Sequence, residues 1–473
     1  MLQHHTARKY TRLKYVQNIL LLLSDSDSYI PLTIVTIVMF GIASWLIFWP
    51  ATDPARYQCY ALTFWFGSHA TAYLPAGQCN FLHITGEQPA FRMLPLEYPP
   101  LTLALFSIPL LAPLPYYQFA FTLVMAFLSV VIYWLLQRYG TRGAALIFTF
   151  YIFIGACALA QTRYDLLPAM MTLLCLIAAE RKQWTAAYIA LALGVLLKIY
   201  PIMLLPALFI AEQQAKARFA QPGSRNLQEL PAEIWRTLRG ATSWQWKNCL
   251  VFLGIVVSVT GCFAFFNVDN AVLSQVNYFL HRPIQIEATG GTLLWLAREM
   301  GVPWQGIVYD YGSINISSNL TGIVANLSTT CFVLGFLYVI WLQWQRKIDF
   351  AQTAIALTLV FIATGKVFSP QYLIWLIPLL AYTGAFNGVW LFLWGSISLQ
   401  TTIIYAFFNS RIDAVGTQII TLPAGFFEMA CIRNVFFVVL TLAYLGNWFQ
   451  IRERRGQTQA QTQKNLALVT RPL

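Results

Sequence analysis

Apolar stretches of about 20 residues recur along the chain from Ile30 to Phe449, separated by short polar connections. A helix of that length crosses about 30 Å of hydrocarbon, so the pattern predicts membrane-spanning helices. About 12 such helices are expected, and they begin near these residues: Ile30, Tyr116, Arg142, Asp165, Trp184, Pro201, Cys249, Thr321, Ala351, Tyr372, Asn387 and Val435. The predicted fold class is an all-α polytopic membrane protein.

One further apolar stretch, at 99–112, is shorter than the others. It begins with Pro99 and Pro100 and is interrupted by Pro109. Such a stretch is too short for a full crossing, and proline breaks the interior of a helix. Counting it as a crossing would also place the later basic clusters outside the cell. It is therefore predicted to be an interfacial or re-entrant helix within the first external loop.

The basic connections between the apolar stretches set the predicted orientation. Lys and Arg concentrate at 137–142, 180–183, 212–247, 345–347 and 452–455, and the positive-inside rule places such clusters in the cytoplasm. The expected organisation is a cytoplasmic tail at 1–29, a single transmembrane domain at 30–450 and a basic cytoplasmic tail at 451–473. Within that domain, we expect external loops at 50–115 and 267–320 and a cytoplasmic loop at 212–247.

Composition agrees with a chain whose core lies in lipid. Of its 473 residues, 58% are hydrophobic and 10% are charged, against roughly 25% charged in an average soluble domain. The net charge of +12 comes from short clusters without a continuous basic face, so no nucleic-acid partner is indicated. The 8 cysteines show neither CxxC nor Cys/His spacing. Cys59 and Cys79 share the first external loop, and the sequence leaves open whether they form a disulfide.

Two carboxylates of the first external loop are candidates for acid–base chemistry. Asp53 follows the first span in PATDPARYQCY, where a carboxylate at the lipid–water boundary can accept a proton from a bound hydroxyl. Glu97 precedes two prolines in LPLEYPPL, near a predicted helix N-terminus. A helix-end or capping role would explain either residue equally well.

Charged side chains also lie at two short external turns. Arg163 and Asp165 are close together in QTRYDLLP, and Lys198 interrupts an apolar run in LLKIYP. A cation in that position is costly unless it is paired or bound to a ligand. A structural ion pair, or a lysine that extends to the membrane interface, is the plain alternative.

Two polar motifs remain, one in the second long loop and one between two late spans. HRPIQIE contains Arg282, which can bind a phosphate, with Gln285 and Glu287 nearby to orient it or to bond a sugar hydroxyl. GKVFSPQYLIWLIP is a tight hinge that carries four polar side chains, and packing alone would also explain it: Lys366, Ser369, Gln371 and Tyr372.

Taken together, these motifs resemble glycosyltransferase family 87, the polyprenol-phosphate-mannose-dependent mannosyltransferases and their relatives. The resemblance spans roughly residues 30–449 and rests on these segments: Asp53 with Gly67 and Tyr73, EYPPL at 97–101, RYDLLPA at 163–169, LKIYP at 197–201, RPIQIE at 282–287 and KVFSPQYLIWLIP at 366–378. It implies a GT-C fold, a bundle of about 12 transmembrane helices with interfacial helices in the first external loop.

The resemblance also implies an activity, the inverting transfer of a hexose, with mannose the expected sugar, from a polyprenyl-phosphate donor to an extracytoplasmic glycan or glycolipid. Asp53 takes the role of the family's catalytic base, with Glu97 as the alternative. By chemistry alone, the candidates for binding the donor phosphate are, in falling order, Arg282, Lys366, Arg163 and Lys198. The expected substrate-binding residues are Tyr98, Asp165, Gln285, Glu287, Ser369, Gln371 and Tyr372.

Two other classes of protein share parts of this pattern. A transporter or flippase of lipid-linked sugars commonly shows inverted repeats and mid-membrane charges, whereas here the charges gather at one face and no repeat is evident. A glycan polymerase or ligase, which uses a diphosphate-linked oligosaccharide, stays open. No HExxH, Walker or GxGxxG motif is present, so no cofactor is implied. No metal is implied either, since Arg and Lys can neutralise a phosphate. The expected location is the cell membrane, with the site on its outer side.

Overall fold

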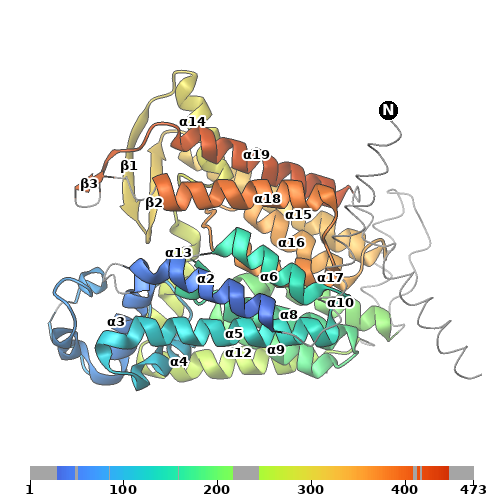
Figure 1. The fold of residues 1–473 in the computed structure, drawn as a ribbon, viewed down its shortest axis with the longest axis horizontal. Coiled ribbons are helices and arrows are strands. Elements are labelled where there is room, and N and C mark those ends of the chain that lie inside the picture. The colour runs from blue at the N-terminus through green and yellow to red at the C-terminus, as the bar shows by residue number, and fades with distance from the viewer. Residues whose placement is uncertain are drawn as a thin grey trace, which may run out of the picture.

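The computed structural model describes residues 29–47, 52–84, 86–157, 159–216, 244–408, 413–415 and 418–446. In Figure 1 the helices α5, α9 and α12 form the lower part of the molecule. The helices α15, α16, α18 and α19 of the second half form the upper part. The two predicted tails and the middle of the loop at 212–247 lie outside the described residues.

Within the described part of the chain, five helices are long and apolar enough to cross a membrane. They are α5 (Tyr117–Tyr139), α12 (Lys247–Phe266), α15 (Thr321–Trp344), α18 (Gly388–Ile403) with its π-helical extension η9 (Ile404–Phe408), and α19 (Phe426–Leu445). The most apolar windows of α12 and α15 are only 6% and 11% buried. Such apolar, unburied surfaces suit contact with lipid. The structure thus agrees with an all-α membrane protein, but it does not show the 12 predicted crossings.

Shorter apolar helices fill the space between the long ones. They are α2 (Ile30–Ile47), α6 (Ala144–Ala156), α7 (Leu159–Thr162), α8 (Leu166–Glu180), α9 (Trp184–Leu197), η5 (Tyr200–Leu204), α10 (Leu205–Ala215), α16 (Phe350–Thr364) and α17 (Tyr372–Thr383). Nearly every side chain of α16 and α17 is buried, because helices that are apolar on all sides pack at the centre. The polar hinge motif that begins at Lys366 connects these two buried helices.

The segment expected to form the first external loop is built from short helices. Besides α3 (Asp53–Phe66), it contains η1 (Ser68–Tyr73), η2 (Asn80–Leu82), α4 (Thr102–Ser107), η3 (Ile108–Leu111) and η4 (Leu114–Tyr116). The apolar stretch at 99–112 is therefore a single short helix with a 3-10 turn, interrupted at Pro109 as expected.

The segment expected to form the second external loop adds a small sheet to an otherwise helical structure. It contains η8 (Asp269–Leu273), α13 (Ser274–His281) and α14 (Thr289–Glu299), followed by the hairpin β1 (Trp304–Asp310) and β2 (Ser313–Ser318). With β3 (Asp413–Val415) and β4 (Gln418–Thr421), the hairpin forms an antiparallel sheet in the order β2-β1-β4-β3. Its turn, Tyr311-Gly312, has positive φ at both residues, as a two-residue hairpin turn requires.

The start of the last helix corrects the sequence prediction. The predicted start at Val435 is wrong, because α19 already begins at Phe426, after Gly425 with a φ of 85°. The charged residues Glu428 and Arg433 both belong to this helix, and Arg433 is fully buried.

Candidate functional site

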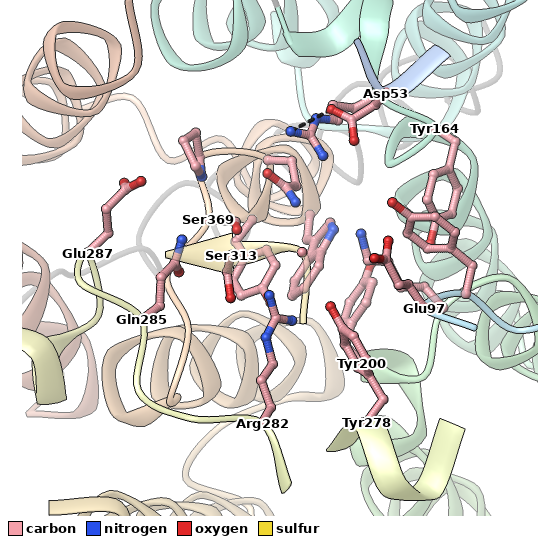
Figure 2. Close-up of a pocket in the computed structure, with 18 of the residues that line it drawn as sticks. Asp53, Glu97, Tyr164, Tyr200, Tyr278, Arg282, Gln285, Glu287, Ser313 and Ser369 are labelled. Carbon is pink, nitrogen blue, oxygen red and sulfur yellow. Dashed lines mark ion pairs between the residues drawn. The ribbon is translucent and has the colours of Figure 1, made fainter. Parts of the chain in front are cut away.

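A cavity of about 1000 Å³ lies where the polar motifs meet. Most of the predicted site residues line it (Figure 2): Asp53, Glu97, Tyr98, Arg163, Lys198, Arg282, Gln285, Glu287, Ser369, Gln371 and Tyr372. Asp165 and Lys366 are not among the lining residues. Segments more than 300 residues apart in the sequence thus contribute to one site, as the short motifs predicted.

Asp53 begins the helix α3 at the edge of this cavity. Pro54 occupies the first turn, where its missing N–H costs nothing, and a helix N-terminus is a favourable place for a carboxylate. Oδ2 of Asp53 lies 2.6 Å from a guanidinium nitrogen of Arg163, in the turn before α8. Its other oxygen, Oδ1, has no hydrogen-bond partner among the described residues. That oxygen is available to a ligand.

Glu97 is held by a residue that the sequence analysis did not single out. Arg56, on the second turn of α3, lies 2.6 Å from Oε1 of Glu97 and stacks over the ring of Phe81. The backbone of Gly312 approaches the same carboxylate so closely that a Cβ there would lie 2.9 Å from Oε1. The carboxylate is therefore enclosed by α3 and by the hairpin turn. Tyr98, beside it, has a pKa well above the ordinary value because of burial, so its phenol is neutral.

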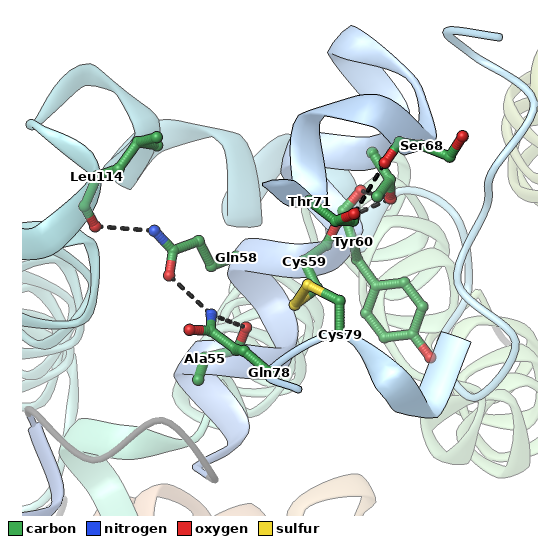
Figure 3. The surroundings of a disulfide bond; sticks show 10 residues. Ala55, Gln58, Cys59, Tyr60, Ser68, Thr71, Gln78, Cys79 and Leu114 are labelled. Atoms are coloured by element: carbon green, nitrogen blue, oxygen red, sulfur yellow. Dashed lines mark hydrogen bonds between the residues drawn. A yellow bond between two sulfur atoms is a disulfide. The ribbon is translucent and has the colours of Figure 1, made fainter. Parts of the chain in front are cut away.

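A disulfide anchors α3, which carries Asp53 and Arg56. Cys59 of α3 is bonded to Cys79, so the pairing that the sequence left open is present (Figure 3). Gln78 donates from Nε2 to the carbonyl of Ala55 at 3.1 Å and to Oε1 of Gln58 at 3.0 Å. These contacts tie the loop after α3 to the turn of the helix that follows Asp53.

The third ion pair joins Lys198, which lines the cavity, to Asp165, which does not. Lys198, in the turn after α9, donates to Asp165, which is 1% exposed and also accepts from the indole of Trp375 at 2.6 Å. The ammonium lies over the rings of Tyr164 and Trp375. Burial lowers the pKa of Lys198, while the carboxylate of Asp165 acts against that shift. The pair expected between Arg163 and Asp165 does not form, because each takes a different partner.

The fourth pair assigns Glu287 a structural partner. Nη1 of Arg433 lies 3.1 Å from Oε2 of Glu287, and neither side chain is more than 4% exposed. Arg433 also donates to the carbonyl of Glu287, and Asn434 donates to the same carbonyl at 3.1 Å. The carboxylate of Glu287, which was expected to contact the substrate, therefore forms an ion pair with Arg433 of α19. Glu287 nevertheless borders the cavity.

Arg282 differs from the other basic residues of the cavity. Among the described residues it has no carboxylate partner, and its buried Nε has no hydrogen-bond partner. Its guanidinium lies over the ring of Tyr278, and Tyr372 lines the same cavity. In Figure 2 Asp53 and Arg282 enter the cavity from opposite sides.

The loop that carries Arg282 is locked on two sides. The N–H of Gln285 donates to the carbonyl of Lys366 at 2.9 Å, and its Oε1 accepts from the N–H of Phe368 at 2.9 Å. On the other side, the flanking residues Ile284 and Ile286 exchange backbone hydrogen bonds with β2. These two hydrogen bonds of Gln285 hold the loop in place, and Gln285 also lines the cavity.

Lys366 lies apart from the cavity. Its ammonium donates to the carbonyl of Leu280 at 3.3 Å, on the exposed side of the hinge. Of the other hinge residues, Ser369, Gln371 and Tyr372 do line the cavity. Oε1 of Gln371 is buried without a hydrogen-bond partner, which marks it as available to a ligand.

Several lining residues were missed by the sequence analysis. Arg56 follows Asp53 by three residues, a spacing that places both on one helix face, but the segment had been treated as a loop. Tyr278 and Tyr309 lie in the segment expected to form the second external loop, whose α13 and β1 were not anticipated. Tyr405 lies on the π-helical η9 and lines the cavity.

The cavity contains ion-paired carboxylates and an arginine, Arg282, that has no carboxylate partner within the described residues. Such a site among apolar helices suits a membrane-embedded transferase. The model of glycosyltransferase family 87 matches residues 96–224 of the chain. The match confirms the resemblance to this family, and the chain is a glycosyltransferase. The matched segment includes Glu97, Arg163 and Lys198 but neither Asp53 nor Arg282. No curated protein matches the chain.

The pair between Arg433 and Glu287 generates a prediction about stability. Arg433→Met should lower the free energy of unfolding by about 3 to 5 kcal/mol, because it leaves a buried carboxylate without its cation. Thermal unfolding in detergent measures the change. Adding Glu287→Gln to Arg433→Met should recover part of the loss, since it removes the uncompensated charge. A single variant as stable as the wild type would show that the pair does not hold the loop.

Proposed function

We propose that the protein transfers a hexose, with mannose the expected sugar, from a polyprenyl-phosphate donor to an extracytoplasmic glycan or glycolipid acceptor, with inversion. One observation carries the proposal. Arg56, Arg163, Lys198 and Arg433 each have a carboxylate partner, whereas Arg282 lines the cavity and has no carboxylate partner among the described residues. An unpaired guanidinium opposite a carboxylate suits a phosphate leaving group and a catalytic base.

The donor phosphate binds at Arg282 in this proposal. A guanidinium matches two phosphate oxygens at once, and such charge-assisted hydrogen bonds are strong. The ring of Tyr278 lies under the guanidinium. The cavity lining also includes apolar side chains, among them Ile202, which is 48% exposed, and Phe332, which packs on Phe361. Such a surface suits the polyprenyl chain of a lipid donor.

The acceptor hydroxyl reacts on the side of Asp53. Oδ1 of Asp53 takes the proton of the hydroxyl while its oxygen attacks the anomeric carbon. The bond from that carbon to the phosphate oxygen breaks, and polyprenyl phosphate leaves with the electron pair. Arg282 stabilises the charge that develops on the leaving group. A single displacement of this kind inverts the anomeric carbon, and Glu97 is the alternative base.

The disulfide supports an outward-facing site. Disulfides form and persist in oxidising compartments, so the bond from Cys59 to Cys79 favours an extracytoplasmic position for α3. Asp53 lies on the same helix, two turns away. This agrees with the orientation expected from the basic clusters, and with a GT-C-like arrangement of a single domain at 30–450.

The competing functions fit the cavity less well. A polymerase or ligase binds a diphosphate, which carries more negative charge than a monophosphate, whereas Arg282 is the lining cation that has no carboxylate partner among the described residues. A flippase needs no base, whereas Asp53 and Glu97 both border the cavity with a carboxylate oxygen that has no hydrogen bond within the described part of the chain. A flippase therefore predicts that loss of Asp53 spares the main activity.

The first prediction of this proposal concerns the donor. Arg282→Ala should lower kcat/KM for a polyprenyl-phosphate hexose by roughly 10- to 150-fold, because a lost charge-assisted hydrogen bond costs about 1.5 to 3 kcal/mol. Lys366→Ala is the matched control, since it removes a cation of the neighbouring hinge that lies outside the cavity. Steady-state kinetics at varied donor concentration measure both variants. Equal kinetics for Arg282→Ala and the wild type would remove Arg282 from the phosphate site.

The second prediction concerns the base. Asp53→Asn keeps the volume of the side chain but cannot accept a proton at neutral pH, so kcat should fall by roughly 10²- to 10⁴-fold while donor binding persists. Glu97→Gln is measured in parallel in detergent-purified protein. If Asp53→Asn keeps its turnover and a folded Glu97→Gln is inactive, the role of base moves to Glu97. If both variants remain active, the proposed mechanism is wrong.

A further inference from the structure

The hairpin of β1 and β2 forms one wall of the cavity. Four of its residues, Tyr309, Gly312, Ser313 and Ile314, line the space, and Figure 2 shows Ser313 among the central side chains. The turn is fixed to the helix of the phosphate site, because Tyr278 donates from its hydroxyl to the carbonyl of Tyr311 at 2.8 Å. The wall is therefore held by contacts and is not a loose loop.

The hairpin turn lies directly against the carboxylate of Glu97. Gly312 has a φ of 64°, a left-handed conformation that glycine adopts without strain. A side chain there would also collide with Oε1 of Glu97, at 2.9 Å from a Cβ. Only glycine lets the turn come this close, so the turn and the ion pair of Glu97 with Arg56 bound the same part of the cavity.

Tyr309 is the aromatic side chain that this wall presents. It lines the cavity and is 44% exposed, and its phenol has no hydrogen bond among the described residues. All four residues of the two ion pairs of α3, Asp53 with Arg163 and Arg56 with Glu97, line the same cavity.

We propose that Tyr309 is the stacking platform for the acceptor sugar, in a subsite between the hairpin and the two ion pairs. The inference rests on the proposed function, because it takes the donor phosphate to bind at Arg282. The apolar face of a pyranose packs on an aromatic ring, while its hydroxyls need both donors and acceptors. Each pair supplies both, with guanidinium N–H groups beside carboxylate oxygens.

The charges of the subsite also define the class of acceptor. Arg56 and Arg163 are each neutralised by a carboxylate at 2.6 Å, so this end of the cavity offers no net positive charge to an anion. The unit that receives the hexose is accordingly an uncharged sugar and not a phosphorylated or carboxylated one. The hydroxyl of such a sugar lies next to Asp53, the proposed base.

Kinetics with a synthetic acceptor test the platform. The donor is a short-chain polyprenyl-phosphate mannose with a tritium label in the sugar, and the acceptor is octyl mannoside. Tyr309→Ala should raise the KM for octyl mannoside by about 5- to 30-fold, the loss expected for an aromatic anchor, and leave the KM for the donor unchanged. Tyr309→Phe should stay within about threefold of the wild type, because the ring remains.

Two controls separate the subsite from the stability of the hairpin. Gln305→Ala alters the same strand away from the cavity, where Gln305 donates to Asn319 and accepts from Ser317, and it should keep wild-type kinetics. Thermal stabilisation by polyprenyl monophosphate reports the donor site without any transfer. Tyr309→Ala should retain that stabilisation, and its loss would show that Tyr309 only supports the fold, which overturns the proposal.

The remaining outcomes distinguish the two proposals. An active wild type whose Tyr309→Ala variant keeps the acceptor KM, or raises both KM values equally, contradicts the platform alone. A wild type that transfers to no acceptor and is not stabilised by polyprenyl monophosphate contradicts the proposed function, and the platform falls with it.

Discussion

Every buried carboxylate around the cavity must have a cation, because an unpaired charge inside a lipid-embedded bundle costs several kcal/mol. The chain meets this constraint four times, with the pairs Asp53–Arg163, Glu97–Arg56, Asp165–Lys198 and Glu287–Arg433. Each pair joins two segments that are distant in sequence. The same pairing leaves Arg282 as the basic residue lining the cavity that has no carboxylate partner among the described residues.

The ion pairs and their neighbouring hydrogen bonds hold both sides of the site in place. Arg433 and Asn434 fix the carbonyl of Glu287, and Gln285 bonds to the hinge, so the loop of Arg282 is held before any ligand arrives. On the opposite side, the disulfide and the bonds of Gln78 hold the helix that begins with Asp53. Under the proposed function, the Arg282 loop and the helix that begins with Asp53 are therefore both held in position before the substrates bind. The hairpin completes the wall between the two ends.

Hydropathy alone predicted much of the helical framework, because long apolar runs such as α15 have few alternatives in lipid. Most of the site residues that the motifs predicted do line the cavity. The sequence could not reveal which cation pairs with which carboxylate: Arg163 adjoins Asp165 in the chain, yet it pairs with Asp53 across the site. The strands were missed because the hairpin is short and its turn, Tyr-Gly, is not a strong turn signal. The start of α19 was misplaced because the helix begins at Phe426 and buries Arg433, a charged residue that hydropathy does not place inside an apolar helix.

The central claim is that the cavity breaks the bond between a hexose and a lipid monophosphate. Its most direct test incubates the purified protein in lipid nanodiscs with sugar-labelled polyprenyl-phosphate hexose, diphosphate-linked oligosaccharide or nucleotide sugar, each with a membrane glycolipid extract. The account predicts transfer of label from the monophosphate donor only, with polyprenyl phosphate released in equal amount. Transfer from the diphosphate-linked oligosaccharide or the nucleotide sugar, with none from the monophosphate donor, would contradict it.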